Sequence, residues 1–385
     1  MSHFSRDELD ARLERARSLL KARGFAGLLL FAQESHFYLT GYDTSGYVFF
    51  QCAVLPADGR PMVLLTRRPD VQQAKETSTI EDIRVWHDTE DANPALDLRA
   101  ILDELGFEGA RLGVELATHG LTGANWERVR RALDGWCTLE DASDLVRSLR
   151  VVKSEQELVY VRKAAQLADD ALLAMIAAIE PGRLDTAVTA AGMKAILEGG
   201  GDMPPAGPLL NSGRRALYGR GVCGEHMIEA QDQISIEFAA TYHRYNCCIQ
   251  RTAVVGEPSA RHRTLFATVR EAIGAMVEAA VPGRPLGEID DAHRRVFDAA
   301  GHQVNRFAAC GYSLGATYRP LWMDVPPMLF SGNRTEARPG MVIFLNAMLP
   351  DPGSGLAMSL GHTIVVTERG CEVLSRLPLE LPVVA

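Results

Sequence analysis

The sequence has few of the features that mark membrane or nucleic-acid binding. No hydrophobic run in its 385 residues approaches the roughly 18 apolar residues that cross a bilayer. The stretch 1–17 is charged and helical in pattern, whereas an export signal has a basic start followed by an apolar segment. Long basic runs are absent, and 40 Lys and Arg are outnumbered by 49 Asp and Glu, which gives a net charge of −9. We therefore expect neither a membrane nor a nucleic acid as a partner.

Cysteine is also scarce, and it lacks the spacing of a disulfide or metal scaffold. Only seven cysteines occur, and no two are spaced as C-x-x-C. An odd, irregularly spaced set argues against a disulfide framework or a zinc ribbon, and it favours a cytoplasmic location. A Walker A loop, a G-x-G-x-x-G turn after a predicted strand and an H-E-x-x-H motif are missing too. The sequence therefore predicts no cofactor.

The composition that is present is typical of a packed globular protein, with 47% hydrophobic and 23% charged residues. At roughly 150 residues per domain, this length predicts two domains. The first part of the chain has helical spacing over 5–23 and 95–105, and short apolar runs at 26–32 and 61–66 that resemble buried strands. These elements predict an α/β domain.

From Ser154 onward the pattern changes to long helices interleaved with strand-like runs. Helical spacing covers 154–179, 184–199, 260–281 and 286–300. Strand-like runs lie at 233–240, 245–255, 341–349 and 363–368. This pattern predicts an α+β domain with antiparallel strands, and the break between the two domains falls near Leu149.

Several segments of the second part resemble one superfamily in order and spacing. They are LRVVKSEQELVYVRKAAQLADDALLAM from Leu149, DQISIEFAATYHRYNCCIQRTAVVGEP (232–258), ACGYSLGATYRP (309–320), RPGMVIFLNAML (338–349) and GHTIVVTERGCEVL (361–374). These segments resemble the creatinase/methionine-aminopeptidase superfamily, whose catalytic domain has the pita-bread fold. The resemblance implies an α+β protein of two domains: a creatinase-like N-terminal α/β domain over 1–145 and a pita-bread catalytic domain over 146–385.

The resemblance also implies a metal site, from which this sequence departs. The metallopeptidases of the superfamily hold two divalent ions with two Asp, one His and two Glu. At the five matching positions this chain has, in order, Glu237, Cys248, Tyr312, Asn346 and Gly361. A single carboxylate does not offset the dehydration of two cations, so we predict no catalytic metal.

A closer likeness is to the ectoine hydrolases, metal-free members of the superfamily that open a cyclic amidine. The shared features are E-F-A-A at 237–240, C-G-Y-S-L-G at 310–315 and P-L-W-M-D at 320–324. Creatinase, which hydrolyses a guanidinium C–N bond without metal, is less similar, because 217–222 lacks the histidine that creatinase uses as acid and base. The likeness implies a reaction at a C–N bond.

Three residues are the predicted catalytic groups. By resemblance to the ectoine hydrolases, Glu237 is the nucleophile or general base, and Asp324 is a second carboxylate for proton transfer or for the substrate charge. Tyr312 is expected to donate a hydrogen bond or a proton near the leaving nitrogen. A purely structural alternative is that Glu237 pairs with a core arginine such as Arg251.

Other residues are expected to bind the substrate. Arg319 would clamp a substrate carboxylate, and Trp322 would form an aromatic wall against a cation. The further residues predicted to line the site are Tyr245, Cys248, Gln250, Asn346 and His362, with Tyr218 and Arg220 as candidates from the region 210–230. By analogy with the creatinase branch, Tyr47 would reach the site across a homodimer interface.

The sequence as a whole predicts a cytoplasmic homodimer that hydrolyses a C–N bond of a small amidine-, guanidine- or amide-bearing amino-acid derivative, without metal or cofactor. Ectoine-like substrates are the first candidates and creatine-like ones the second. A metal-dependent Xaa-Pro dipeptidase or aminopeptidase is the first alternative. A non-catalytic binding module of pita-bread fold is the second, and a lyase acting on a related zwitterion is the third.

Overall fold

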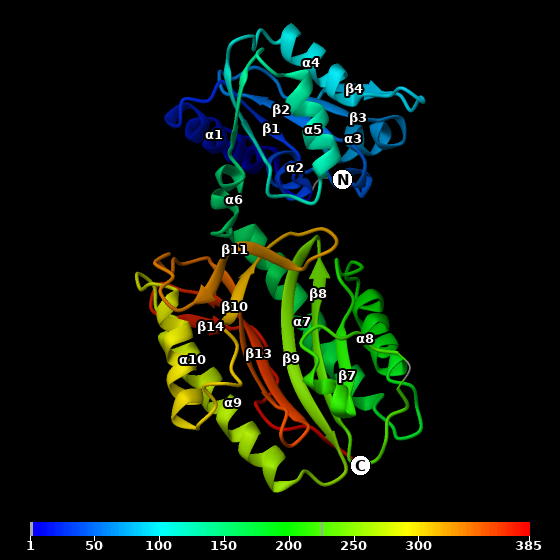
Figure 1. Ribbon diagram of the computed structural model, residues 1–385, viewed down its shortest axis with the longest axis vertical. Coiled ribbons are helices and arrows are strands. Elements are labelled where there is room, and N and C mark those ends of the chain that lie inside the picture. The colour runs from blue at the N-terminus through cyan, green and yellow to red at the C-terminus, as the bar shows by residue number, and fades with distance from the viewer. Residues whose placement is uncertain (1–2, 225) are drawn as a thin grey trace. The chain divides into compact units, whose positions relative to one another are not determined.

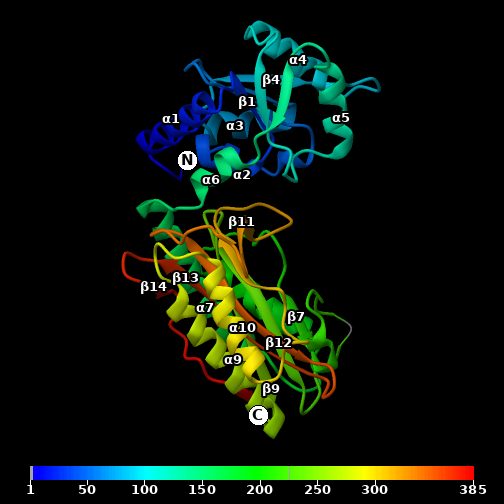
Figure 2. The ribbon, with the colours of Figure 1, turned by 60° about the vertical axis from the view of Figure 1, so that its left-hand side comes forward.

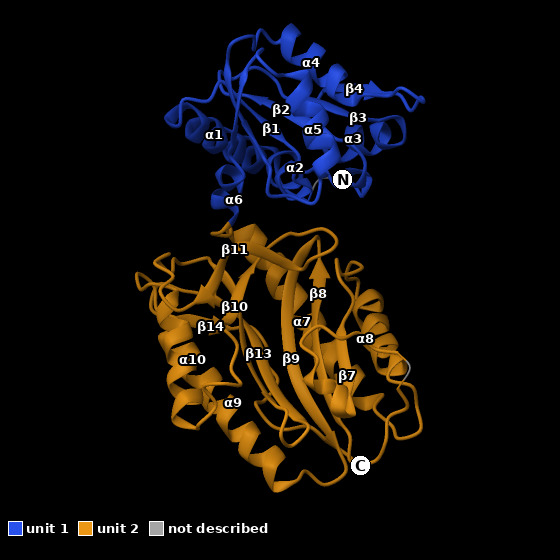
Figure 3. Cartoon of the chain, in the orientation of Figure 1, with its two compact units in different colours: residues 1–150 blue, residues 151–385 orange. Residues whose placement is uncertain are grey.

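The computed structural model describes residues 3–224 and 226–385, which form two compact units, Met1–Arg150 and Val151–Ala385 (Figure 3). Each unit has its own sheet and its own hydrophobic core. Within the described residues, no helix combines the length and apolar character that a bilayer-spanning segment requires.

The first unit is built on a six-stranded mixed sheet in the order β4-β3-β2-β1-β5-β6 (Figure 1). Its strands are β1 (Gly27–Leu30), β2 (Cys52–Pro56), β3 (Val63–Arg67), β4 (Asp82–Trp86), β5 (Arg111–Val114) and β6 (Thr138–Asp141). Its α-helices are α1 (Arg6–Ala22), α2 (Gln33–Thr40), α3 (Val71–Thr77), α4 (Pro94–Glu104), α5 (Gly123–Ala132) and α6 (Asp144–Arg150). Two 3₁₀ turns, η1 (Gly46–Val48) and η2 (Arg68–Asp70), complete it.

Local sequence accounts for the first helix and the strand that follows it. The Ser5 hydroxyl accepts a hydrogen bond from the Glu8 backbone N–H, which satisfies one of the free donors at the start of α1. Gly24, at φ +70°, follows the helix in a conformation that suits glycine. All four residues of β1 are buried, as the apolar run predicts. The predicted helix over 5–23 and the strand within 26–32 are therefore confirmed.

The second unit is built on a nine-stranded sheet that is antiparallel except where β15 pairs with β9. The main path runs β11-β10-β12-β13-β9-β8-β7, with β14 beside β13 and β15 beside β9. Its strands are β7 (Leu209–Ser212), β8 (Gln233–Tyr242), β9 (Tyr245–Val255), β10 (Ala309–Leu314), β11 (Met323–Phe330), β12 (Val342–Asp351), β13 (Leu356–Val366), β14 (Cys371–Val373) and β15 (Val383–Val384).

Four long helices cover one face of this sheet (Figures 1 and 2). They are α7 (Glu155–Ala177), α8 (Thr186–Glu198), α9 (Ala260–Ala279) and α10 (Gly287–Ala299), and a 3₁₀ turn, η3 (Gly213–Leu217), follows β7. The helix α7 packs on β8 and β9, and α9 packs on β12 and β13. Apolar side chains from alternate strand positions fill the two helix-covered cores, so the intervening positions point to the opposite face.

The four long helices and the four strands predicted for this unit are all present, but the sequence pattern missed the other five strands, among them β10 and β11. Glycine at 311 and prolines at 326 and 327 interrupt their apolar runs. Proline removes a backbone donor and is confined to strand edges and irregular positions, so such a segment does not look like a strand. In the structure β11 is an edge strand of the sheet, where missing backbone hydrogen bonds are tolerated.

Candidate active site

Glu237 lies in the middle of β8, on the face of the sheet that the four helices leave uncovered. It pairs with Gln250 of β9, and Gln250 also pairs with Gly361 of β13. An open cavity of about 510 Å³ lies over this region. The lining residues are Ala206, Gly207, Leu209, Gly219, Arg220, Glu237, Phe307, Tyr312, Pro320, Leu321, Trp322, Met323, Asn346 and Met348. Glu237 is the only carboxylate among these lining residues.

The carboxylate of Glu237 accepts hydrogen bonds from two neutral side chains. The Tyr312 hydroxyl donates to Oε1 at 3.1 Å, and Gln250 Nε2 lies 3.3 Å from Oε2. Trp322 Nε1 donates in turn to the Tyr312 oxygen at 2.8 Å. The Cys248 sulfur lies 3.7 Å from the same oxygen, on the buried side. Tyr312 is therefore held with its proton directed at Glu237.

Burial sets the protonation of both groups. It raises the pKa of Glu237 from 4.5 to about 7, although the hydrogen bond from Tyr312 and the positive charge of Arg220 act in the opposite direction. Burial, together with the charges of Cys248 and Glu237, holds the pKa of Tyr312 well above its usual 10. Near neutral pH the site thus has a carboxylate that gains and loses a proton beside a hydroxyl that keeps its own.

Glu237 does not pair with Arg251, as the purely structural alternative required. Arg251 lies on the helix-covered face, where its Nη1 donates to the carbonyl oxygens of Gln250 and Gly361, each at 2.8 Å. Neighbouring strand positions point to opposite faces, so Arg251 points away from Glu237. Among the described residues, no ion pair involves Glu237. A buried carboxylate with a raised pKa that lines a cavity marks a candidate functional site.

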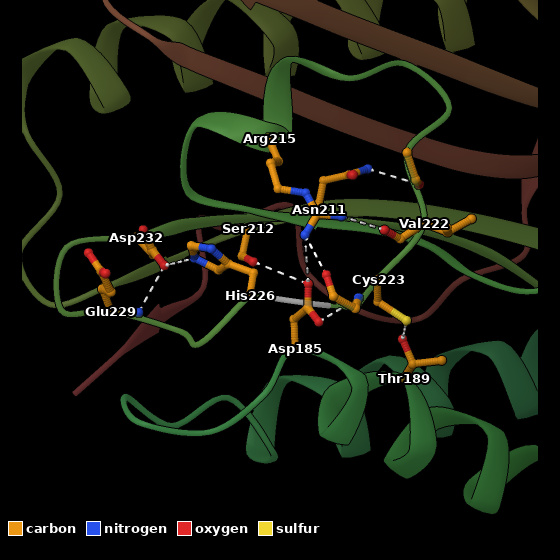
Figure 4. A network of polar contacts seen from close by, with 12 residues as sticks. Asp185, Thr189, Asn211, Ser212, Arg215, Val222, Cys223, His226, Glu229 and Asp232 are labelled. Atoms are coloured by element: carbon orange, nitrogen blue, oxygen red, sulfur yellow. Dashed lines mark hydrogen bonds and ion pairs between the residues drawn. The ribbon is translucent and has the colours of Figure 1, made fainter.

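Arg220 is the cationic residue of the cavity wall, and a polar network holds its loop in place (Figure 4). The guanidinium of Arg215 donates to the carbonyl oxygens of Gly224 at 2.6 Å and Val222 at 2.8 Å. The Gly224 N–H donates to Asp185 Oδ1 at 2.7 Å. These bonds fix the chain just after Arg220, which is itself exposed.

Two further contacts tie the same loop to β7 and to α8. Asn211 Nδ2 donates to the carbonyl oxygen of Gly221 at 3.1 Å, and the Thr189 hydroxyl donates to the Cys223 sulfur at 3.2 Å (Figure 4). Because the loop is bonded on both sides, Arg220 is presented to the cavity from a defined backbone.

The five positions that match the superfamily's metal ligands lie together, but their side chains do not fit two cations. Asn346 pairs with Gly361, and Tyr312 contacts both Glu237 and Cys248. At Gly361, an added Cβ would lie 2.4 Å from Cζ of Phe344, whose ring occupies the space that a fifth ligand would need. Within the described part of the chain, no three of the His, Cys, Asp and Glu side chains meet at this cavity. One carboxylate beside an amide, a thiol and a phenol is a poor set for two hard divalent ions.

The structure brings together seven of the residues predicted for this site. Five of them line the cavity: Arg220, Glu237, Tyr312, Trp322 and Asn346. Gln250 and Cys248 contact Glu237 and Tyr312 from behind.

Four predicted residues lie elsewhere in the second unit. Arg319 is exposed in the turn before β11 and does not line the cavity, and Asp324 of β11 is buried with its carboxylate against Gly315. Tyr245 points to the helix-covered face, where its hydroxyl donates to Glu157 of α7 at 2.7 Å. His362 pairs with Leu345, a residue of the helix-side core. Its pKa is lowered to about 3 by burial and by the charge of Arg251.

Tyr47 and Tyr218 complete the predicted set. Tyr47 is buried in the 3₁₀ turn η1 of the first unit, and its role across a dimer interface stays a prediction. Tyr218 is exposed and does not line the cavity, whereas Gly219 and Arg220 beside it do.

Sequence reasoning missed the apolar wall of the cavity, which comprises Leu209, Phe307, Met323 and Met348. Their only signal in the sequence is hydrophobicity, which core residues share. Leu209 and Met323 belong to strands whose runs are short or interrupted, and Phe307 lies outside any strand or helix. Only the pairing of distant strands brings these residues to one place.

Comparisons with known proteins agree with this architecture. Residues 159–368 match the model of metallopeptidase family M24, and residues 12–152 match the creatinase/prolidase N-terminal domain.

The ectoine hydrolase of Halomonas elongata is 27% identical over 98% of this chain and 98% of its own. The Xaa-Pro dipeptidase of Pyrococcus furiosus is 29% identical over 62% of this chain and 67% of its own. The crystal structure of a prolidase from Thermococcus sibiricus superposes with a TM-score of 0.89 at 20% identity, over 99% of this chain and all of that one. With a two-unit fold and these matches along both units, the chain belongs to metallopeptidase family M24 and carries a creatinase/prolidase N-terminal domain.

Proposed function

We propose that this chain hydrolyses a C–N bond of a small amidine-, guanidine- or amide-bearing amino-acid derivative, without a catalytic metal. The observation that carries the proposal is the hydrogen-bonded pair of Glu237 and Tyr312 in a cavity whose other positions cannot supply a dinuclear ligand set. The similarity to an ectoine hydrolase along almost the whole chain supports a cyclic amidine as the first substrate to test.

The pair offers the groups that such a hydrolysis needs. The unprotonated Glu237 carboxylate either bonds to the amidine carbon or takes a proton from the water that attacks it. In the general-base route the water oxygen bonds to the carbon, the bond from that carbon to one nitrogen breaks, and the proton that Glu237 took from water passes to the leaving nitrogen. In the covalent route one water gives its proton to the leaving nitrogen and its hydroxide to the carbon, which breaks the bond to Glu237. Tyr312 keeps its proton and donates it to Glu237 at 3.1 Å, so it holds the carboxylate in position, and it can donate to the leaving nitrogen only after that hydrogen bond breaks.

The cavity also fits the charge pattern of such an amino-acid derivative: a cationic amidine suits Glu237, and a carboxylate suits Arg220 at the wall. Apolar side chains between them would contact the carbon skeleton. A cavity of about 510 Å³ matches a small molecule.

Chelator treatment should not abolish hydrolysis of a cyclic amidine or guanidine, because the described residues at the cavity do not form a ligand set for two metal ions. The measurement is turnover on a panel of ectoine, hydroxyectoine, creatine, N-acyl amino acids and Xaa-Pro dipeptides. Hydrolysis of dipeptides alone, restored only by Mn²⁺, Co²⁺ or Zn²⁺, would instead establish the dipeptidase alternative that the Pyrococcus relative favours. No turnover, with ligand-dependent shifts in melting temperature, would establish a binding module.

Replacing Arg220 by Gln should raise KM for a carboxylate-bearing substrate by about 10-fold to 100-fold with a smaller change in kcat, because a charge-assisted hydrogen bond is lost on binding. The matched control is Arg214→Gln, which removes an exposed arginine of the neighbouring turn that does not line the cavity. Equal kinetics of the two variants would remove Arg220 from substrate recognition. A substrate analogue in which an amide replaces the carboxylate should bind the wild type and Arg220→Gln with equal affinity, because it carries no negative charge for Arg220 to pair with.

A further inference from the structure

A second group of metal-binding side chains lies away from the cavity, between α10 and β10. Asp290 and His293 are three residues apart on α10 and therefore share one face of the helix. Cys310 belongs to β10. One ligand atom from each of the three lies within 4.8 Å of the others, and all three side chains are buried. None of them lines the cavity that contains Glu237.

Two polar atoms of this cluster lack the hydrogen bonds that buried atoms normally make. Asp290 Oδ1 and His293 Nδ1 lie 3.5 Å apart, within ion-pair distance of each other, but neither makes a close hydrogen bond among the described residues. The other oxygen of Asp290 is satisfied, since it accepts from Arg294 Nε at 2.5 Å and from the Ser331 N–H at 2.9 Å. A metal ion between Asp290 Oδ1 and His293 Nδ1 would give both buried atoms the close partner that they lack.

We propose that Asp290, His293 and Cys310 bind one divalent transition-metal ion, for which Zn²⁺ is the best match. A carboxylate, an imidazole and a thiolate are all zinc ligands, and the thiolate disfavours Mg²⁺ and Ca²⁺. With Asp290 and Cys310 ionised, their two negative charges balance the dication. His293 Nδ1 supplies a neutral third ligand. Arg294 stays on the other oxygen of Asp290, where it orients the carboxylate.

Binding at this cluster would be structural. The ion would join α10 to β10, the strand that carries Tyr312 two residues beyond Cys310. Burial and the charge of Asp290 raise the pKa of the Cys310 thiol in the metal-free chain, so the metal displaces one proton from the sulfur as it binds. The proposal is independent of the proposed function, and it has a practical consequence. Stoichiometric zinc in the purified protein would not by itself indicate a dinuclear peptidase centre.

The test is metal binding by the full-length protein after chelator treatment and removal of the chelator. Titration with Zn²⁺ against a chromophoric competitor should give one equivalent per chain for the wild type. Cys310→Ser and His293→Gln should each weaken binding by at least about 100-fold, since each removes a ligand. Cys371→Ala removes a partly buried cysteine elsewhere in the unit, and Glu237→Gln removes the cavity carboxylate. Both of these controls should bind Zn²⁺ as the wild type does.

Cobalt provides a readout that does not depend on how well the variants fold. Co²⁺ added to the wild-type protein should produce a near-ultraviolet thiolate-to-cobalt absorption band, which Zn²⁺ then displaces. Absence of that band at saturating Co²⁺, or absence of a Zn²⁺ equivalent, overturns the proposal. So does a Zn²⁺ equivalent that Glu237→Gln abolishes and Cys310→Ser preserves, because the ion would then lie in the cavity.

Discussion

Replacing Glu237 by Gln should lower kcat/KM of the chelator-treated protein by at least about 1,000-fold on whichever substrate the panel identifies. The change keeps the size of the side chain and its capacity to accept the hydrogen bond from Tyr312. It removes the negative charge, so the side chain can act neither as nucleophile nor as general base. Loss of either role lowers kcat/KM by a factor of this order or more. The measurement is steady-state kinetics at about pH 8, where the wild-type carboxylate is ionised.

Two further variants make this result specific. Glu229→Gln changes an exposed glutamate of the same unit that does not line the cavity, and it should leave kcat/KM unchanged. Asp324→Asn changes the carboxylate that the sequence resemblance assigned to catalysis, which the structure places against Gly315 and outside the cavity wall. A loss at Asp324 as large as the loss at Glu237 would restore the two-carboxylate mechanism and contradict the site described above.

Much of this architecture could be predicted from the sequence, because the helices have clear periodicity and the matching segments occur in superfamily order. The same segments place Glu237, Tyr312 and Trp322 in one cavity. Pattern alone failed for β10 and β11, where glycine and proline interrupt the apolar runs.

Strand parity explains two errors among the predicted lining residues. Cys248 and Gln250 are two residues apart on β9 and share a face, whereas Tyr245 is an odd number of positions from both and points to α7. Gly361 pairs with Gln250 on the cavity face of the sheet. His362 is the next residue of the strand, so its side chain points to the opposite face, into the helix-side core beside Leu345. The period of two along a strand therefore excludes both residues from the cavity face.

Arg220 could not have been placed in this way, because no periodic pattern covers its loop. The contacts that position the loop come from Asp185 and Asn211. Asp185 is distant from Arg220 in sequence, and Asn211 lies on the separate strand β7. The sequence analysis named Arg220 as a candidate lining residue without a role, whereas the resemblance assigned the substrate carboxylate to Arg319, a residue that the structure places in an exposed turn. A positive charge at the cavity was thus anticipated, but its source depends on long-range contacts that one sequence does not reveal.

Raising the pH from about 5 to about 8 should increase kcat/KM by roughly 100-fold, with a midpoint near pH 7. The pKa of Glu237 is raised to about 7, so only about one molecule in a hundred has the reactive carboxylate at pH 5. The rise should be about tenfold per pH unit below the midpoint and should level off above it. A midpoint near 4.5 would mean that the titrating group is solvated, and would contradict the buried site.

The same pKa should make stability change in the opposite direction. Below about pH 4.5, Glu237 is protonated in both the folded and the unfolded chain, so burial of the neutral acid costs little. Between pH 4.5 and pH 7 the unfolded chain ionises Glu237 while the folded chain keeps the proton, so about 3 kcal/mol of unfolding free energy is lost across this window, and the loss levels off above pH 7. Glu237→Gln lacks this penalty, so its stability relative to the wild type should grow between pH 5 and pH 8 by about that amount. Urea unfolding of both proteins across this range measures the difference, and a constant difference would show that Glu237 keeps its ordinary pKa. A protein that gains activity and loses stability around one pKa has its reactive carboxylate in a site organised for chemistry and not for packing.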